Sequence, residues 1–161
     1  MLNILPADPS DAPVLAEIQK RTFDEDALKY RNKAEDGPPG YDSIAWQAEM
    51  MKKGHYFKLL ADGVIIGGMI VFPASGEDEF LLLRIFIDPL QQNRGFGQEA
   101  FHFLFASYPS AKRWSLDTPS WAIRNHHFYK KMEFVQTGVI GDPDSQDAFF
   151  EYERISSNVT A

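Results

Sequence analysis

Two glycines in a short loop are the residues of this chain that best fit a chemical role. They lie in the run Gln92-Asn93-Arg94-Gly95-Phe96-Gly97-Gln98, which follows an apolar segment and precedes a helical pattern. A helix beginning here would offer backbone N–H groups without partners and the positive end of its dipole. Glycines would let that backbone approach an anion closely, and Arg94 would add positive charge at the rim. The run therefore predicts a site for a phosphate or diphosphate group.

The spacing of these glycines has more than one interpretation. A helix start that merely contains glycine accounts for it equally well. Residues 95–100 also fit the G-x-G-x-x-A fingerprint of dinucleotide-binding proteins, which begins a series of βαβ units. Here the run follows three predicted hairpin strands, and too little chain remains for a doubly wound sheet. A P-loop is excluded, because no Gly-Lys-Ser/Thr follows.

The spacing of apolar residues and the positions of turn-forming residues predict the helices and strands that position this loop. Residues 9–30 and 43–53 have helical spacing, with Asp8 and Asp42 or Ser43 as caps. Asp62-Gly63 predicts a tight hairpin between two strands. The remaining predictions are strands at 2–5, 55–62, 64–72, 80–87, 112–117, 134–140 and 148–155, helices from 95 and over 121–131, a turn at 75–78 and a frayed tail at 156–161.

This order, β-α-α-β-β-β-α-β-α-β-β, predicts an α/β fold with a mixed, mostly antiparallel central sheet and helices on both faces. Parallel pairing is expected where a helix joins consecutive strands. The nearly unbroken apolar run 80–87 predicts a strand that is buried on both faces. The 161 residues fit a single domain, 1–161, and the sequence has no internal repeats.

Composition excludes several classes of protein. The net charge of -7 and pI near 5.0 lack the basic footprint of a duplex nucleic-acid binder. No cysteine is present, which excludes disulfides, thiolate metal ligands and an acyl-cysteine intermediate. The four histidines have no metal-ligand spacing, so no metal is expected. No apolar stretch approaches a membrane span and no signal peptide is visible, so we expect a cytoplasmic protein that does not bind membranes.

With these elements in place, the chain resembles the GNAT N-acetyltransferase superfamily. Gln92 to Gly97 match its Gln/Arg-x-x-Gly-x-Gly/Ala motif, and the Ile87-Asp88-Pro89 strand end is similar. Residues 128–134 look like the family's aromatic-Tyr-x-Lys-x-Gly-Phe segment, with Glu133 in place of the glycine. Residues 6–18 are also similar, so the resemblance covers nearly the whole chain.

The resemblance implies direct transfer of an acetyl group from acetyl-CoA to a primary amine, without a metal. Cofactor contacts are then expected from Ile85, Phe86, Ile87, Gln92, Asn93, Arg94, Gly95, Phe96, Gly97, Gln98 and Asn125. The first three would bind pantetheine, inserted as a pseudo-strand where two strands splay apart, and polarise the thioester carbonyl. Asn125 either replaces the family's asparagine, whose position is Ala122, or only bonds locally.

Two catalytic residues follow from the same resemblance. Tyr129 matches the tyrosine that protonates the departing thiolate. The family's usual glutamate falls at Leu81, so Glu79, two residues earlier on the same side of the strand, is the candidate general base. The alternative for Glu79 is a solvated carboxylate in an acidic turn.

The acceptor is expected to be a small-molecule amine, with Phe23, Tyr30, Tyr41 and Trp46 as candidate lining residues or simple core. Alternatives are a protein or peptide N-acetyltransferase, a non-catalytic acyl-CoA-binding module, or a dinucleotide binder. A homodimer is compatible with any of them.

Overall fold

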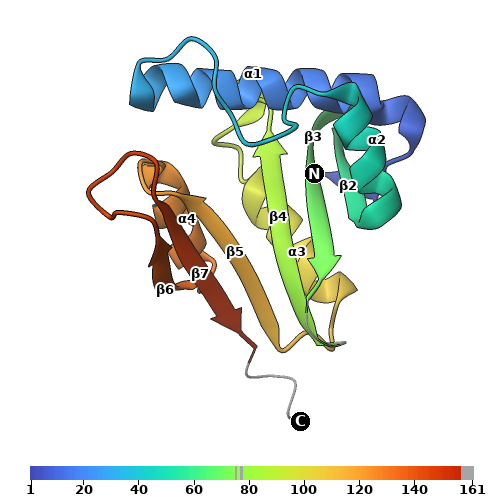
Figure 1. The fold of residues 1–161 in the computed structure, drawn as a ribbon. Helices are drawn as coiled ribbons and strands as arrows, with labels where there is room; N and C mark the ends of the chain where they lie inside the picture. The colour runs from blue at the N-terminus through green and yellow to red at the C-terminus, as the bar shows by residue number, and fades with distance from the viewer. Residues whose placement is uncertain (75, 77, 157–161) are drawn as a thin grey trace.

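The computed structural model describes residues 1–74, 76 and 78–156, so Ser75, Glu77 and most of the predicted tail lie outside the described residues. Helices α1 (Ala12–Arg31) and α2 (Ile44–Lys53) cover one face of a seven-stranded sheet. Helices α3 (Phe96–Ser107) and α4 (Ile123–Lys131) cover the other face (Figure 1). The predicted α/β order and the placement of helices on both faces are confirmed.

The sheet runs in the order β1-β2-β3-β4-β5-β7-β6. All neighbouring strands pair antiparallel except β4 and β5, which are joined by α3 and pair parallel as predicted. The expectation of a second parallel pair is wrong, because β7 inserts between β5 and β6. The strands are β1 (Asn3–Pro6), β2 (His55–Ala61), β3 (Val64–Pro73), β4 (Glu79–Ile87), β5 (Arg113–Pro119), β6 (Val135–Ile140) and β7 (Phe149–Ile155).

The predicted caps form at the helix starts. Asp8 and Asp11 make a reciprocal capping box around the 3-10 turn η1 (Pro9–Asp11), which leads into α1. Ser43 Oγ accepts a hydrogen bond from the Trp46 backbone N–H at 3.1 Å, which starts α2. Asp62 and Gly63 both have positive φ, 51° and 81°, so the predicted tight hairpin joins β2 to β3.

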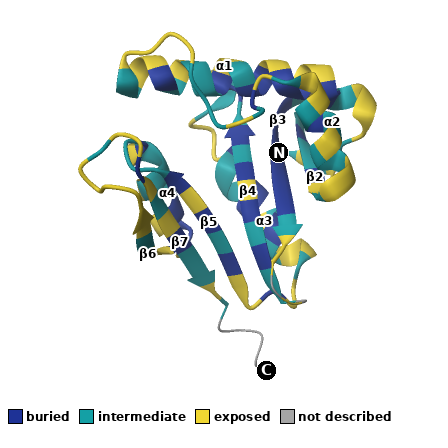
Figure 2. Ribbon diagram, in the orientation of Figure 1, coloured by how far each residue is buried: buried dark blue, intermediate teal, exposed yellow. Residues whose placement is uncertain are grey.

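The prediction that residues 80–87 are buried on both faces is wrong. Burial alternates along β4 (Figure 2). Within this strand, Leu83 is 37% exposed. A bulge causes a change of face, because Ile70 pairs with Arg84 and Val71 with Leu82, leaving Leu83 without a partner. Before the bulge Leu82 packs towards α3, whereas after it Phe86 packs towards α1.

The pairing of β4 with β5 ends early. It covers only Glu79 with Arg113, Phe80 with Trp114 and Leu81 with Ser115. Beyond these pairs the two strands diverge (Figure 1), as the resemblance implied. The edge of β4 from Leu82 to Ile87 therefore faces an opening instead of a neighbouring strand.

Candidate active site

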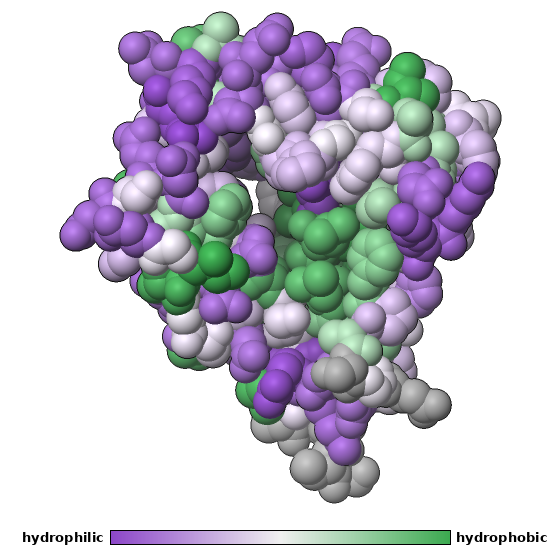
Figure 3. Space-filling model, viewed as in Figure 1, coloured by the Kyte–Doolittle hydropathy of each residue, from purple (hydrophilic) through white to green (hydrophobic). Residues whose placement is uncertain are grey.

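Two cavities open where β4 and β5 diverge. The larger cavity, of about 640 Å³, lies between the end of α1, the loop at residues 36–39 and the ends of β5 and β7. The smaller cavity, of about 310 Å³, leads along the end of β4 to the glycine turn and α3. In Figure 3 a hollow below α1 exposes apolar surface in its centre and polar surface at its rim.

The glycine turn closes the end of the smaller cavity. Asp88 Oδ1 accepts a hydrogen bond from the Leu90 N–H at 3.1 Å and starts the 3-10 turn η2 (Pro89–Gln91). Gly95 has φ +79°, a left-handed conformation, and immediately precedes α3. A Cβ atom on Gly95 would meet nothing within 4 Å, so the space in front of the helix start is open. This turn presents the unpartnered N–H groups of α3 to the cavity.

The second glycine also has a packing role. A Cβ atom on Gly97 would lie 3.0 Å from Cζ of Phe128. Gly97 thus allows α3 and α4 to approach each other, and places Phe128 and its neighbour Tyr129 beside the turn. The family resemblance linked these two motifs, and the packing shows how they come together.

Most predicted cofactor residues come together around the smaller cavity. Those that line it are Ile85, Phe86, Ile87, Gln92, Asn93, Gly95, Phe96, Gly97, Gln98 and Asn125. Gln92 Nε2 also donates to the carbonyl of Ile87 at 2.9 Å, which ties the turn to the end of β4. Arg94 is exposed and lies outside the lining residues. Arg124 and Lys131, which the sequence analysis missed, supply positive charge here instead.

Five residues border both cavities and form a shared wall: Phe23, Asp26, Ile85, Asn125 and Tyr129. Asn125 Nδ2 donates to Thr118 Oγ1 at 3.3 Å, so it bonds locally and also lines the site. The Tyr129 hydroxyl makes no hydrogen bond with any residue in the described part of the chain. Burial, with Asp117 and Tyr152 nearby, raises the pKa of Tyr129 above its ordinary value, so the hydroxyl stays protonated.

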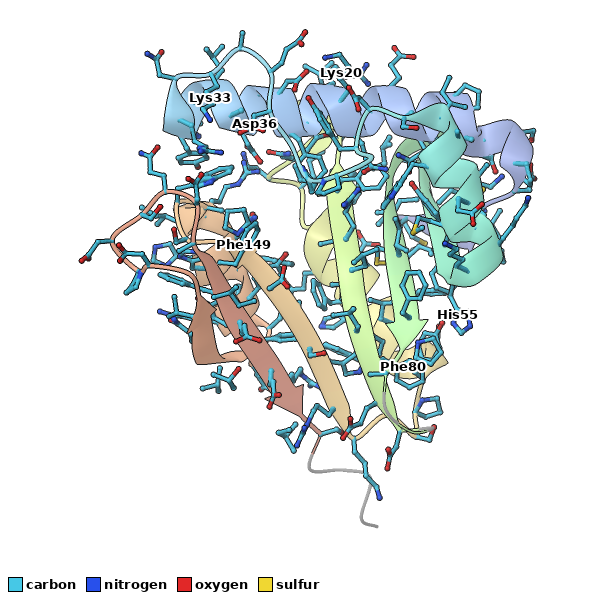
Figure 4. The ribbon with its side chains drawn as sticks, viewed as in Figure 1. Lys20, Lys33, Asp36, His55, Phe80 and Phe149 are labelled. Carbon is cyan, nitrogen blue, oxygen red and sulfur yellow. The ribbon has the colours of Figure 1, made fainter. Side chains whose placement is uncertain are left out.

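Glu79 is a correction to the predicted site. It lies at the start of β4 and within 3.8 Å of Arg113. It lies six positions before Ile85, which is about 20 Å of extended strand. In Figure 4 the neighbouring residue Phe80 lies at the start of β4, far from the labelled cavity residues Phe149 and Asp36. Glu79 lines neither cavity and is not brought together with Tyr129.

Of the four candidate acceptor aromatics, only Phe23 lines a cavity. Tyr30 packs on Trp121 with ring centroids 5.8 Å apart, and the Tyr41 hydroxyl donates to Asp24 at 2.7 Å. Trp46 lies under the guanidinium of Arg84, 4.3 Å from its carbon. The other three aromatics, Tyr30, Tyr41 and Trp46, therefore pack behind the lining residues and do not line either cavity themselves.

Carboxylates line the larger cavity. Asp26 and Asp117 have no cation within 4 Å in the described residues, and burial raises the pKa of both. Asp36 and Asp147 instead form ion pairs with Arg31, at 2.6 and 3.2 Å. Arg31 thereby joins the loop after α1 to the loop before β7, across one side of the cavity.

Within the described ranges, no group of three His, Cys, Asp or Glu side chains is arranged to hold a metal ion. His126 Nε2 instead lies 3.0 Å from the carbonyl of Pro119, and burial lowers the pKa of His126. No described helix combines the length and apolar character needed to cross a bilayer.

The family model described as the Acetyltransferase (GNAT) family matches residues 15–134. The chain therefore belongs to the GNAT acetyltransferase family. The Bacillus subtilis (strain 168) protein YrkN is 26% identical over 123 residues. That match covers 76% of this chain but only 66% of YrkN, just under two thirds of the relative's length.

Solved structures share the fold. An acetyltransferase from Thermus thermophilus has a TM-score of 0.77 at 15% identity, covering 97% of each chain. The ribosomal-protein-S18-alanine N-acetyltransferase of Escherichia coli has a TM-score of 0.75 at 16% identity, covering 98% of each. The PaiA N-acetyltransferase of Thermoplasma acidophilum, solved with coenzyme A, has a TM-score of 0.73 at 14% identity, covering 97% of this chain and 99% of that one.

Proposed function

We propose that this chain transfers an acetyl group from acetyl-CoA directly to the primary amine of a small molecule. One observation carries the proposal. The cavity that ends at an anion-binding helix start and the cavity lined by carboxylates meet at one wall, formed by Ile85, Asn125 and Tyr129 among others. A donor and an acceptor that enter from opposite sides would meet there.

The smaller cavity fits the cofactor. The helix start before Gly97 offers N–H groups for a diphosphate, while Arg124 and Lys131 add positive charge to a chain whose net charge is -7. The open edge of β4 at residues 85–87 offers backbone groups to an extended amide-containing arm. Acetyl-CoA supplies an acetyl group activated as a thioester. The PaiA relative, solved with coenzyme A, supports this choice.

Tyr129 is proposed as the proton donor to the departing thiolate. Its raised pKa keeps the proton on the hydroxyl at neutral pH, and the hydroxyl has no partner within the described residues to compete for it. Asp26 is proposed to take the proton from the attacking amine, in place of Glu79. It borders both cavities, and burial raises its pKa towards the range of a general base.

A small acceptor is favoured over a protein. Arg31 joins two loops across the larger cavity, through Asp36 and Asp147, and this narrows the approach. A cavity of about 640 Å³ is also within the range of small-molecule sites.

The test is thermal stabilisation by acetyl-CoA and by CoA in the wild type and in Gly95→Glu. The new carboxylate would occupy the open space at the helix start and repel a diphosphate, so stabilisation should be lost. Gly63→Glu is the matched control, because Gly63 also has a left-handed φ, +81°, and no atom within 4 Å of an added Cβ. Equal stabilisation of all three proteins by acetyl-CoA would show that the cofactor does not bind at the glycine turn.

Release of free CoA on a panel of amines and peptides tests the rest. Binding of acetyl-CoA without turnover of any amine or peptide would indicate a binding module. Turnover of peptides alone would indicate a protein N-acetyltransferase.

A further inference from the structure

The cations of the larger cavity are not equivalent. Arg31 is paired with Asp36 and Asp147, and Lys33 lies 3.7 Å from Asp36. Arg84, which also lines the cavity, has no carboxylate oxygen within 4 Å among residues 1–74, 76 and 78–156. It is also deeply enclosed, with only 9% of its surface exposed. The cavity thus contains a buried positive charge that the described part of the protein does not neutralise.

The contacts of Arg84 leave part of its guanidinium unused. Nη1 donates to Gln19 Oε1 and Nη2 to the carbonyl of Pro39, both at 3.2 Å. The indole of Trp46 lies 4.3 Å from the guanidinium carbon, which offsets part of the desolvation cost. An arginine has five N–H donors, of which these bonds use two. A structural role in holding the 36–39 loop requires only those two, and a neutral glutamine could supply them.

Burying a cation without a counter-charge is strongly unfavourable, so the charge itself needs an explanation. Burial lowers the pKa of Arg84 only to about 10, and the guanidinium remains charged at neutral pH. A bound carboxylate would neutralise it and accept its remaining donors in the bidentate geometry that suits a guanidinium. The bulge at Leu83 is what turns this side chain towards α1 and the larger cavity.

The opposite charge lies elsewhere in the same cavity. Asp26 and Asp117 are its two carboxylates without a described cation within 4 Å, and Asp26 belongs to the shared wall. Leu83 and Phe149 also line the cavity, and they are 37% and 39% exposed. The cavity therefore complements a ligand with a cationic amine, an anionic group and an apolar side chain.

We propose that Arg84 binds the carboxylate of the acceptor, and that the acceptor is a free amino acid with an apolar side chain, or a closely related amino carboxylate. This inference rests on the proposed function and names its substrate class. The amine of such a molecule lies towards Asp26 and Tyr129 at the shared wall, where the acetyl group is transferred. Asp26 removes one proton from the ammonium, and the freed nitrogen lone pair forms the new N–acetyl bond as the bond between sulfur and the acetyl carbon breaks, leaving its electron pair on sulfur. Tyr129 gives its proton to that thiolate and regains one from the second proton that the nitrogen loses.

The experiment compares three acceptors that differ only at the carboxylate: phenylalanine, phenylalanine amide and phenethylamine. Release of CoA is measured for the wild type, Arg84→Gln and Lys33→Gln. In the wild type, kcat/KM for phenylalanine should exceed that for the two analogues that lack a carboxylate by about 100-fold or more, since a buried charge pair is lost with each analogue. Arg84→Gln should reduce this ratio to below about 10-fold, mainly through the KM for phenylalanine. Lys33→Gln should retain the ratio, because Asp36 already neutralises Lys33.

A second measurement does not depend on turnover or on a folded variant. With CoA present, N-acetylphenylalanine should raise the Tm of the wild type, whereas N-acetylphenethylamine should not. Turnover of the three acceptors at similar rates, or similar stabilisation by both products, would overturn the role of Arg84 while leaving the proposed function intact. Acetylation of peptides alone would overturn the assignment of a free amino acid as acceptor and indicate a protein acceptor instead. Absence of turnover with every amine would overturn the proposed function itself.

Discussion

Nη2 of Arg21, in the middle of α1, lies 2.6 Å from Oδ2 of Asp88, the residue that follows β4. Asp88 is 9% exposed, and its other oxygen caps η2 ahead of the glycine turn. The ion pair thus fixes α1 against the loop that carries Gly95. Phe23 and Asp26, further along α1, are placed on the shared wall by the same contact.

Replacing Arg21 with alanine should lower the free energy of unfolding by about 1–2 kcal/mol, because a nearly buried carboxylate loses its charged partner. Chemical denaturation measures this change. Glu17→Ala is the control, since Glu17 contacts the same arginine at 3.3 Å but is 74% exposed. Its loss should be within about 0.5 kcal/mol. Similar losses in both variants would show that the Asp88 contact contributes nothing beyond a surface ion pair.

Tyr129→Phe should lower kcat by roughly 100- to 10,000-fold, because it removes the proposed proton donor while keeping the ring. The Kd for acetyl-CoA should change little. Steady-state kinetics and calorimetric binding measure the two effects.

Tyr152→Phe is the matched control for this substitution. Its ring centroid lies 6.0 Å from that of Tyr129 and its side chain is also buried, but it lines neither cavity. Its kcat should remain close to that of the wild type. Unchanged turnover in Tyr129→Phe would remove this hydroxyl from the mechanism.

Glu133→Gly should stabilise the protein by about 0.5–1 kcal/mol, which is a rise in Tm of roughly 1–4 °C for a domain of this size. Glu133 has φ +71°, a conformation that glycine adopts without strain. The contact that would be lost, to Arg154 at 3.5 Å, involves a glutamate that is 80% exposed. Asn32→Gly, at φ +54°, should gain less, because asparagine tolerates this conformation. A lower Tm for Glu133→Gly would contradict the prediction.

Asp26→Asn should raise the Tm at neutral pH even though it impairs activity. Burial raises the folded-state pKa of Asp26 above the unfolded value of about 3.9. Its favourable contribution to stability is therefore fully present only below that value, and it is lost as the pH rises through the folded pKa. The gain from Asn should shrink as the pH falls towards about 4.

Asp36→Asn should have the opposite effect on the Tm, although Asp36 lines the same cavity, because Asp36 is ion-paired with Arg31 at 2.6 Å. It should lower the Tm at neutral pH. Thermal scans of both variants from about pH 4 to 8 test the pair. A lower Tm for Asp26→Asn at neutral pH would contradict the desolvation argument.

The sequence predicted the fold well because its signals are local. The Asp8 cap, the Asp62-Gly63 hairpin and the glycine turn each depend on neighbouring residues. The bulge at Leu83 is not local, since it arises from the pairing of β4 with β3, and it changes the face on which every later side chain lies. This is why burial of residues 80–87 was mispredicted, and why the position of Arg84 was not foreseen. Glu79 precedes the bulge, and its alternative as a carboxylate outside the site was already stated from the sequence. Arg124 and Lys131 were missed for a similar reason, because only the packing of Gly97 on Phe128 brings α4 to the turn.

The early end of the ladder between β4 and β5 leaves this sheet incomplete. Only three residue pairs join the strands, and the remaining edge of β4 would gain a neighbour if an extended molecule bound there. On the proposed function, that neighbour is a metabolite whose concentration varies. A ligand present at about 100 times its Kd stabilises the folded state by about 2.7 kcal/mol. The supply of acetyl-CoA would then influence the survival of the protein against unfolding and proteolysis, as well as its rate of turnover.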